Sequence, residues 1–212
     1  MNRANRNGKA GDLEGDAGSD CQVALLLFDV INRMSFEGSE SLVRRALPMA
    51  DALAALKRKA QKSGIPTIYV NDNFGRWRSD FRATVKYCLR PDSPGRKIAA
   101  RLKPGPRDYF VLKPKHSGFH ATPLGLLLRH LGVRTLVLGG VAANICVLFT
   151  ANDAYMRDYE IHVPSDCVAS NTDGDTREAL RQMRRFLKAD TRRSSHIDFG
   201  ALKLRRPPPQ ER

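Results

Sequence analysis

Short apolar runs alternate along this chain with longer stretches that have helical spacing. Each run is bounded by Gly, Pro or polar residues, which is typical of a strand buried on both faces of a parallel sheet. The strands expected on this basis are residues 23–28, 65–70, 109–112, 133–138 and 160–163. The polar residues 192–196 are a further candidate for a last edge strand.

The stretches between these runs carry helix signals. Residues 41–63 have helical spacing and end at Gly64, and residues 143–157 contain many helix formers. Thr122-Pro123 and Thr172-Asp173 begin two further helices, of which the second runs to about residue 188. Alternating strands and helices predict right-handed βαβ units. The expected fold class is therefore α/β, a three-layer α-β-α arrangement around an open, mostly parallel sheet of about six strands.

The length of 212 residues fits one domain, which we expect at residues 21–200. Residues 1–20, rich in Gly, Asn and Asp, are expected to be a disordered tail, and residues 201–212 a basic, Pro-rich tail. Four scattered cysteines without zinc-finger spacing indicate reduced thiols, and no signal peptide or membrane span is visible. A cytoplasmic protein without a membrane partner is expected.

The net charge of +14 raises the possibility of a nucleic-acid partner. Half of this charge lies in residues 177–212, which hold eleven Lys and Arg against four Asp and Glu. No nucleic-acid motif and no interleaving of arginine with aromatic residues accompanies it. We expect a solvated basic surface that attracts anions nonspecifically, and no nucleic-acid partner.

Candidate chemistry begins at Cys146. The apolar run before it ends in Gly139-Gly140, which permits a sharp turn, and Cys146 falls where the next helix is expected to begin. The N–H groups and dipole of a helix N-terminus favour thiolate over thiol, and can also hold a developing oxyanion. The alternative is that Cys146 is a small buried apolar residue.

Polar side chains directly follow three other expected strands. Asp29 follows the first strand, residues 71–73 (NDN) follow the second, and Lys113 follows the third. Ligands of open α/β sheets bind outside the carboxyl ends of the strands, so Asp29, Lys113 and Cys146 are expected to meet there as acid, cation and nucleophile. Lys115 is the alternative to Lys113, which is favoured because it stands directly at the strand end.

Ordered motifs over residues 23–195 carry a resemblance to a known family. They are 27–29 (LFD), 69–77 (YVNDNFGRW), 112–119 (LKPKHSGF), 122–124 (TPL), 140–147 (GVAANICV), 151–155 (ANDAY) and 164–169 (PSDCVA). The chain resembles the isochorismatase-like cysteine hydrolases, which include nicotinamidases, carbamoylsarcosine amidohydrolases and ureidoacrylate amidohydrolases. Several motifs in one order make this resemblance specific.

The resemblance implies a catalytic triad of Asp29, Lys113 and Cys146. Cys146 would attack a carbonyl carbon and form a thioester, while Asp29 would take the thiol proton and return it to the leaving amine. The resemblance also implies a cis peptide at Val141-Ala142, which would direct the Ala142 N–H, together with that of Cys146, at the oxyanion. The candidates for the lining of the substrate pocket are Asn73, Trp77 and Phe119.

Two departures from the family pattern narrow the activity. Family nicotinamidases hold a metal with two histidines, whereas this chain has no histidine before His116, so no metal and no cofactor are expected. True isochorismatases lack the cysteine that this chain has. Cleavage of a small amide, ureide or carbamoyl compound is therefore preferred over vinyl-ether cleavage.

Two further function classes remain as alternatives. One is a non-catalytic binder of anions or nucleic acids that uses the basic tail, and the other is a flavodoxin-like or dinucleotide-binding protein. The second lacks a Gly-rich phosphate loop after the first strand. A homo-oligomer, dimer or tetramer, is also expected, because residues 126–128 and Leu131 place leucines on more than one face of a helix.

Overall fold

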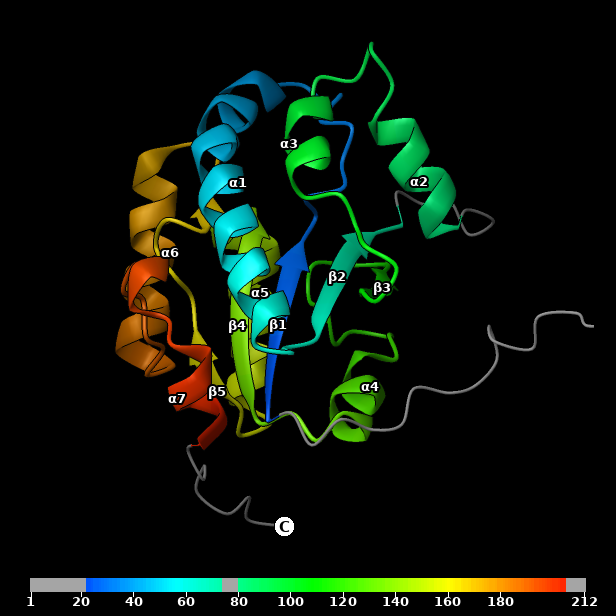
Figure 1. The fold of residues 1–212 in the computed structure, drawn as a ribbon. Coiled ribbons are helices and arrows are strands. Elements are labelled where there is room, and N and C mark those ends of the chain that lie inside the picture. Colours follow the sequence, from blue (N-terminus) through cyan, green and yellow to red (C-terminus); the bar gives the residue numbers. More distant parts are fainter. Residues whose placement is uncertain (1–21, 74–79, 205–212) are drawn as a thin grey trace, which may run out of the picture.

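The computed structural model describes residues 22–73 and 80–204, and its centre is a parallel sheet (Figure 1). Five strands lie in the order β3-β2-β1-β4-β5, and the short β6 pairs with β4. Every strand pair in the sheet is parallel. The strands are β1 (Val23–Phe28), β2 (Thr67–Asp72), β3 (Tyr109–Lys113), β4 (Thr135–Val141), β5 (Glu160–His162) and β6 (Val168–Ala169).

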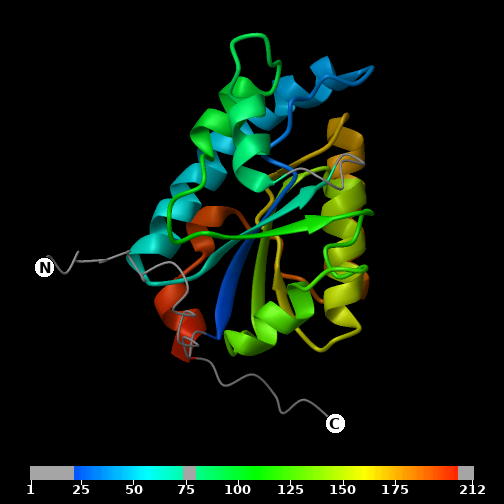
Figure 2. The same cartoon turned by 90° about the vertical axis from the view of Figure 1, so that its right-hand side faces the viewer.

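Helices cover both faces of this sheet, and Figure 2 shows α1 and α7 on one side with α5 on the other. The helices are α1 (Ser39–Lys62), α2 (Phe81–Cys88), α3 (Arg96–Arg101), α4 (Leu124–His130), α5 (Leu148–Tyr155), α6 (Asp173–Phe186) and α7 (Phe199–Leu204). Alternate residues of β1 belong to two different hydrophobic clusters, one with α1, α3 and α7 and one with α4, α5 and α6. The predicted α/β, three-layer fold is confirmed.

The expected edge strand at residues 192–196 is wrong. Residues Ser194–His196 form a 3₁₀ turn, η3, and the sixth strand is instead β6. The carboxylate of Asp166 accepts hydrogen bonds from the backbone N–H of Ser194 at 2.7 Å and from its hydroxyl at 2.8 Å. These side-chain bonds hold this polar segment in a turn, and its residue pattern did not indicate them.

The helix expected over residues 143–157 begins differently from the prediction. Its first part, η2 (Ala143–Val147), is a π-helical turn, and regular α5 starts only at Leu148. The N–H groups of Ile145 and Val147 both donate to the carbonyl of Ala142, at 3.1 and 3.2 Å. Cys146 therefore lies inside a widened turn and not at the first residue of an α-helix.

Two further segments differ from the prediction. The connection between β2 and β3, in which the sequence analysis identified no helix, contains α2 and α3, and Ile98 and Leu102 of that segment are fully buried. Helix α7 continues the packed chain to Leu204, beyond the expected boundary at residue 200, because Phe199 and Leu202 pack into the core. The expected tail 1–20, the rest of the basic tail and Trp77 lie outside the described residues.

Among the described helices, none combines the length and the apolar character that a membrane crossing requires.

Candidate active site

The carboxyl ends of β1, β3 and β4 bring three predicted side chains together. The Nζ atom of Lys113 lies 2.9 Å from Oδ2 of Asp29 and 3.4 Å from Sγ of Cys146. The thiol of Cys146 is in turn a hydrogen-bond partner of the Asp29 carboxyl group. Because neighbouring parallel strands end at one edge, residues far apart in the sequence form one compact cluster.

Asp29 is held in place through its own backbone and its side chain. Its φ of 49° lies in the left-handed region, which is uncommon for a residue other than glycine. Its N–H donates to the carbonyl of Val70 at 3.1 Å, and its Oδ1 accepts the N–H of Asp72 at 2.7 Å. Both contacts come from β2, so the neighbouring strand orients the carboxylate toward Lys113.

Lys113 is the buried cation of the cluster. It is fully buried, and its ammonium group also lies 4.0 Å from Oδ2 of Asp72. Burial by itself lowers the pKa of a lysine, but the Asp29 carboxylate and the Cys146 sulfur outweigh it and raise the pKa of Lys113. Lys113 is therefore charged throughout the neutral range. Lys115 is exposed, so the structure brings Lys113, and not Lys115, to the cysteine.

The expected low pKa of Cys146 is wrong. Burial, together with the adjacent Asp29 carboxylate, raises the pKa of this thiol to about 12, although Lys113 acts in the opposite direction. The regular helix that was expected to supply an N-terminal dipole at Cys146 starts two residues later. Desolvation in the cluster therefore favours the neutral thiol form of Cys146.

The carboxyl group of Asp29 complements this thiol. Its burial raises its pKa above the usual range, against the opposing effect of Lys113 and of its hydrogen bonds. A carboxylate with a raised pKa is a stronger base, and it lies within hydrogen-bonding reach of the thiol. The arrangement is suited to moving a proton from Cys146 to Asp29 when the sulfur attacks a substrate.

The turn that carries Cys146 depends on a glycine. Gly140 has a φ of 118°, and a Cβ at this position would lie 2.2 Å from the carbonyl oxygen of Phe28. The next peptide bond, Val141-Ala142, is cis, as the resemblance implied. The N–H of Asn144 donates to the Ser170 hydroxyl at 3.3 Å, which connects η2 to the residue after β6.

Thr150 is a supporting residue that the sequence did not identify. Its hydroxyl donates to the carbonyl of Cys146 at 2.7 Å and accepts the N–H of Gly118 at 2.9 Å. It therefore links the cysteine turn to the loop after β3. Threonine within a helical stretch gives no sequence signal of this role, because the role depends on which segment faces the helix.

The three pocket candidates have different outcomes. Asn73 is buried beside the site, and its N–H donates to the carbonyl of Lys113 at 3.2 Å. Phe119 packs in a hydrophobic cluster, with its ring 5.9 Å from the ring of Tyr159 and 4.7 Å from the guanidinium carbon of Arg157, and its place in the pocket stays a prediction. Trp77 lies outside the described residues.

The residues after β2 do not fit a zinc or iron site of the family kind. Asp72 is followed by Asn73 where an Asp-x-His pair would begin, and the ammonium of Lys113 already lies beside Asp72. Within residues 22–73 and 80–204, no cluster of three His, Cys, Asp or Glu side chains is arranged to hold a metal ion. No step involving a metal is derived for this site.

The fold and the site define an α/β protein with a Cys, Lys and Asp cluster at the carboxyl edge of a parallel sheet. The isochorismatase domain family matches residues 23–193. The chain belongs to the isochorismatase family and is a hydrolase, as the sequence predicted.

Individual relatives agree with this assignment. The uncharacterised isochorismatase family protein YaaI of Bacillus subtilis is 42% identical over 172 residues, covering 81% of this chain and 94% of its own length. Ureidoacrylate amidohydrolase RutB of Methylorubrum extorquens is 50% identical over 135 residues, covering 53% of each chain. The structure of N-carbamoylsarcosine amidase from Thermoplasma acidophilum has a TM-score of 0.64 and 29% identity, covering 84% of this chain and 99% of that one. The two relatives with named activities are amidohydrolases, which act on C–N bonds other than peptide bonds.

Proposed function

We propose that this protein is a metal-independent cysteine hydrolase that cleaves the C–N bond of a small amide, ureide or carbamoyl compound. The observation that carries this proposal is the position of the Lys113 ammonium, 2.9 Å from Asp29 and 3.4 Å from Cys146. A fully buried cation next to both a base and a thiol stabilises negative charge on the Asp29 carboxylate, and it also stabilises negative charge on the Cys146 sulfur. It therefore lowers the cost of forming a thiolate during the reaction.

The reaction begins with attack on the substrate carbonyl. As the bond from Cys146 sulfur to the carbonyl carbon forms, the thiol proton passes to Asp29. The carbonyl oxygen gains the negative charge, and the N–H groups of Ala142 and Cys146 are the proposed donors to this oxyanion. The tetrahedral intermediate then breaks its C–N bond, and Asp29 returns the proton to the leaving nitrogen. Ammonia or an amine leaves, and an acyl or carbamoyl thioester remains on Cys146.

The second half of the reaction consumes water. Asp29 removes a proton from a water molecule while its oxygen attacks the thioester carbonyl. The C–S bond then breaks, the proton moves from Asp29 to the sulfur, and the carboxylic or carbamic acid leaves. Lys113 remains protonated in both halves, and Asn73, buried at the edge of the site, is proposed to contact the substrate.

A panel of small amides, ureides and carbamoyl compounds, with ammonia release as the readout, tests this function. The native protein is expected to turn over at least one class, before and after exhaustive treatment with a chelator. Cys146→Ser is expected to lose at least about 100-fold in rate, because a serine hydroxyl beside this carboxylate is a far weaker nucleophile. Cys167→Ser is the matched control, since Cys167 is buried outside the cluster. Activity of the Cys146→Ser variant equal to that of the native protein would contradict the proposal, and so would loss of the native activity after chelator treatment.

A further inference from the structure

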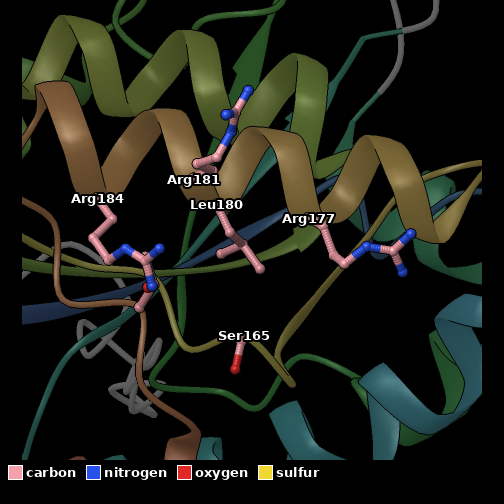
Figure 3. A pocket seen from close by; sticks show the side chains of 6 residues that line it. Ser165, Arg177, Leu180, Arg181 and Arg184 are labelled. Carbon is pink, nitrogen blue, oxygen red and sulfur yellow. The ribbon is translucent and has the colours of Figure 1, made fainter.

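A hollow lies along α6, lined by residues other than those of the cysteine cluster. It has a volume of about 410 Å³ and is bounded by α6 and by the two segments that follow β5 and precede η3 (Figure 3). The residues that line it are Ser165, Arg177, Leu180, Arg181, Arg184 and Thr191. None of them belongs to the group that holds Asp29, Lys113 or Cys146. Hollows of this size accept small organic molecules.

Two arginines of this hollow carry uncompensated charge. In the described part of the chain, neither Arg177 nor Arg184 forms an ion pair. Figure 3 shows both extending from the side of α6 that faces Ser165, with Leu180 between them. Arg181 differs, because it extends from the other side of α6 and pairs with Glu178 at 2.7 Å.

The carboxylates near the hollow are already engaged. Asp166 accepts two hydrogen bonds from Ser194 and lies 3.6 Å from Arg193. Asp190 lies 2.6 Å from the guanidinium of Arg192, whose hydrogen bond is the main cause that lowers the pKa of Asp190 to about 2. Because these acids have cationic partners of their own, they do not neutralise Arg177 and Arg184.

The two free arginines have a spacing suited to one ligand. They are seven residues apart on α6, which places their backbones about 10 Å apart along the helix axis. Two exposed arginine side chains at that distance are long enough to turn toward one phosphate or diphosphate group, and a guanidinium binds phosphate oxygens in bidentate fashion. The hydroxyls of Ser165 and Thr191 add polar atoms opposite α6, and Leu180 supplies an apolar surface.

We propose that this hollow binds the phosphate or diphosphate group of a small phosphorylated compound. Arg177 and Arg184 hold the phosphoryl oxygens, while Leu180 contacts the rest of the ligand. The volume exceeds what an inorganic phosphate ion fills, which favours an organic phosphate ester. The surplus of Lys and Arg in residues 177–212 raises the local concentration of any such anion. The inference is independent of the activity proposed for Cys146.

Calorimetric titration of the full chain with pyrophosphate and, separately, with adenosine diphosphate tests this site at low salt. We expect saturable binding of at least one probe, at least tenfold weaker in Arg177→Gln and in Arg184→Gln. The matched control is Arg185→Gln, since Arg185 lies on the same helix but over the ring of Phe186 and outside the hollow. These side chains are exposed, so all three variants should unfold at the temperature of the native protein.

Each result of this titration decides between defined outcomes. Tighter binding of adenosine diphosphate identifies an organic phosphate ester, whereas tighter binding of pyrophosphate identifies an inorganic source of the same group. The absence of saturable binding for both probes overturns the proposal. Equal weakening in Arg185→Gln and Arg184→Gln overturns it as well, because binding would then follow the net charge of α6 and not this hollow.

Discussion

Two lysines near the cysteine illustrate how position decides the role of a residue. Lys113 and Lys115 have the same side chain and are two residues apart, yet one is fully buried against Asp29 and Cys146 and the other is exposed. The sequence left both as candidates, and it favoured Lys113 only because that residue ends a strand. The buried ammonium of Lys113 interacts strongly with Asp29 and Cys146, whereas water screens the charge of the exposed Lys115.

Replacing the two lysines separately tests this assignment. Lys113→Ala should reduce hydrolysis at least about 100-fold and slow the alkylation of Cys146, because it leaves the carboxylate of Asp29 without its cation. It should also reduce the free energy of unfolding by about 3–5 kcal/mol, as expected for one broken partner of a buried ion pair. Lys115→Ala should change none of these quantities. Rates of ammonia release, iodoacetamide labelling and urea unfolding measure these quantities. Larger effects in Lys115→Ala than in Lys113→Ala would assign the role of the buried cation to Lys115.

The raised pKa of Cys146 predicts how its reactivity depends on pH. With a pKa of about 12, the thiolate fraction at pH 7 is small and grows about tenfold with each pH unit. Alkylation of Cys146 by iodoacetamide should therefore rise steadily from pH 7 to pH 9 without a plateau. Asp29→Asn removes a charge that raises this pKa, so the variant should label faster at pH 7 while losing hydrolysis.

Peptide mass spectrometry resolves this labelling for each cysteine. Cys88, whose pKa burial raises to about 11, serves as an internal comparison in the same samples. A plateau of Cys146 labelling near neutral pH would instead indicate a thiolate already present at rest.

At the scale of elements, the β4 turn and η2 determine where the sulfur lies. The sequence identified the two glycines before the cysteine, and the structure assigns them different constraints. A Cβ on Gly139 would meet the side chain of Leu53 at 2.7 Å, and one on Gly140 would meet backbone atoms of β1. The π-helical turn that follows has no local sequence signal. Its N–H groups bond to the carbonyl of Ala142, whose direction depends on how β4 ends.

Gly140→Ala tests the contribution of this turn. The substitution adds a Cβ at 2.2 Å from the Phe28 carbonyl oxygen and in a positive-φ conformation, so it should destabilise the protein by at least about 1–3 kcal/mol. Gly174→Ala is the control: its nearest neighbour is a hydroxyl at 3.5 Å, and it lies in the first turn of α6. That variant should be neutral or slightly more stable, since alanine favours a helix. Urea unfolding measures both, and equal midpoints would contradict the role of Gly140.

At the scale of the whole molecule, helix faces turned away from the sheet carry apolar side chains. Leu126 on α4 is 65% exposed, Phe149 on α5 is 52% exposed, and Met156 directly after α5 is 78% exposed. The expected homo-oligomer is a way to cover such surfaces, and it remains a prediction. Burial of these side chains in an interface would follow from the same apolar driving force that forms the core.

Light scattering at micromolar concentration tests this expectation. The native chain should have the mass of a dimer or tetramer, and Met156→Glu should shift it toward the monomer. Phe186→Glu is the control, because Phe186 is also an exposed apolar residue, 61% exposed, but it lies on α6 and not on the α4 and α5 surface under test. A monodisperse monomer of the native chain would refute the oligomer and leave the chemistry of Cys146 untouched.

The sequence by itself determined the parallel sheet, the positions of its main strands to within two or three residues, the family and the three side chains of the cluster. It could do so because strand burial and turn glycines leave local patterns, and because parallel strands bring their carboxyl ends to one edge. Only the tertiary structure decided the direction of the Cys146 pKa, the packing of Phe119, the turn at Ser194 and the hollow along α6. Each of these depends on desolvation or on contacts between segments distant in the chain, and the local spacing of residues predicts neither.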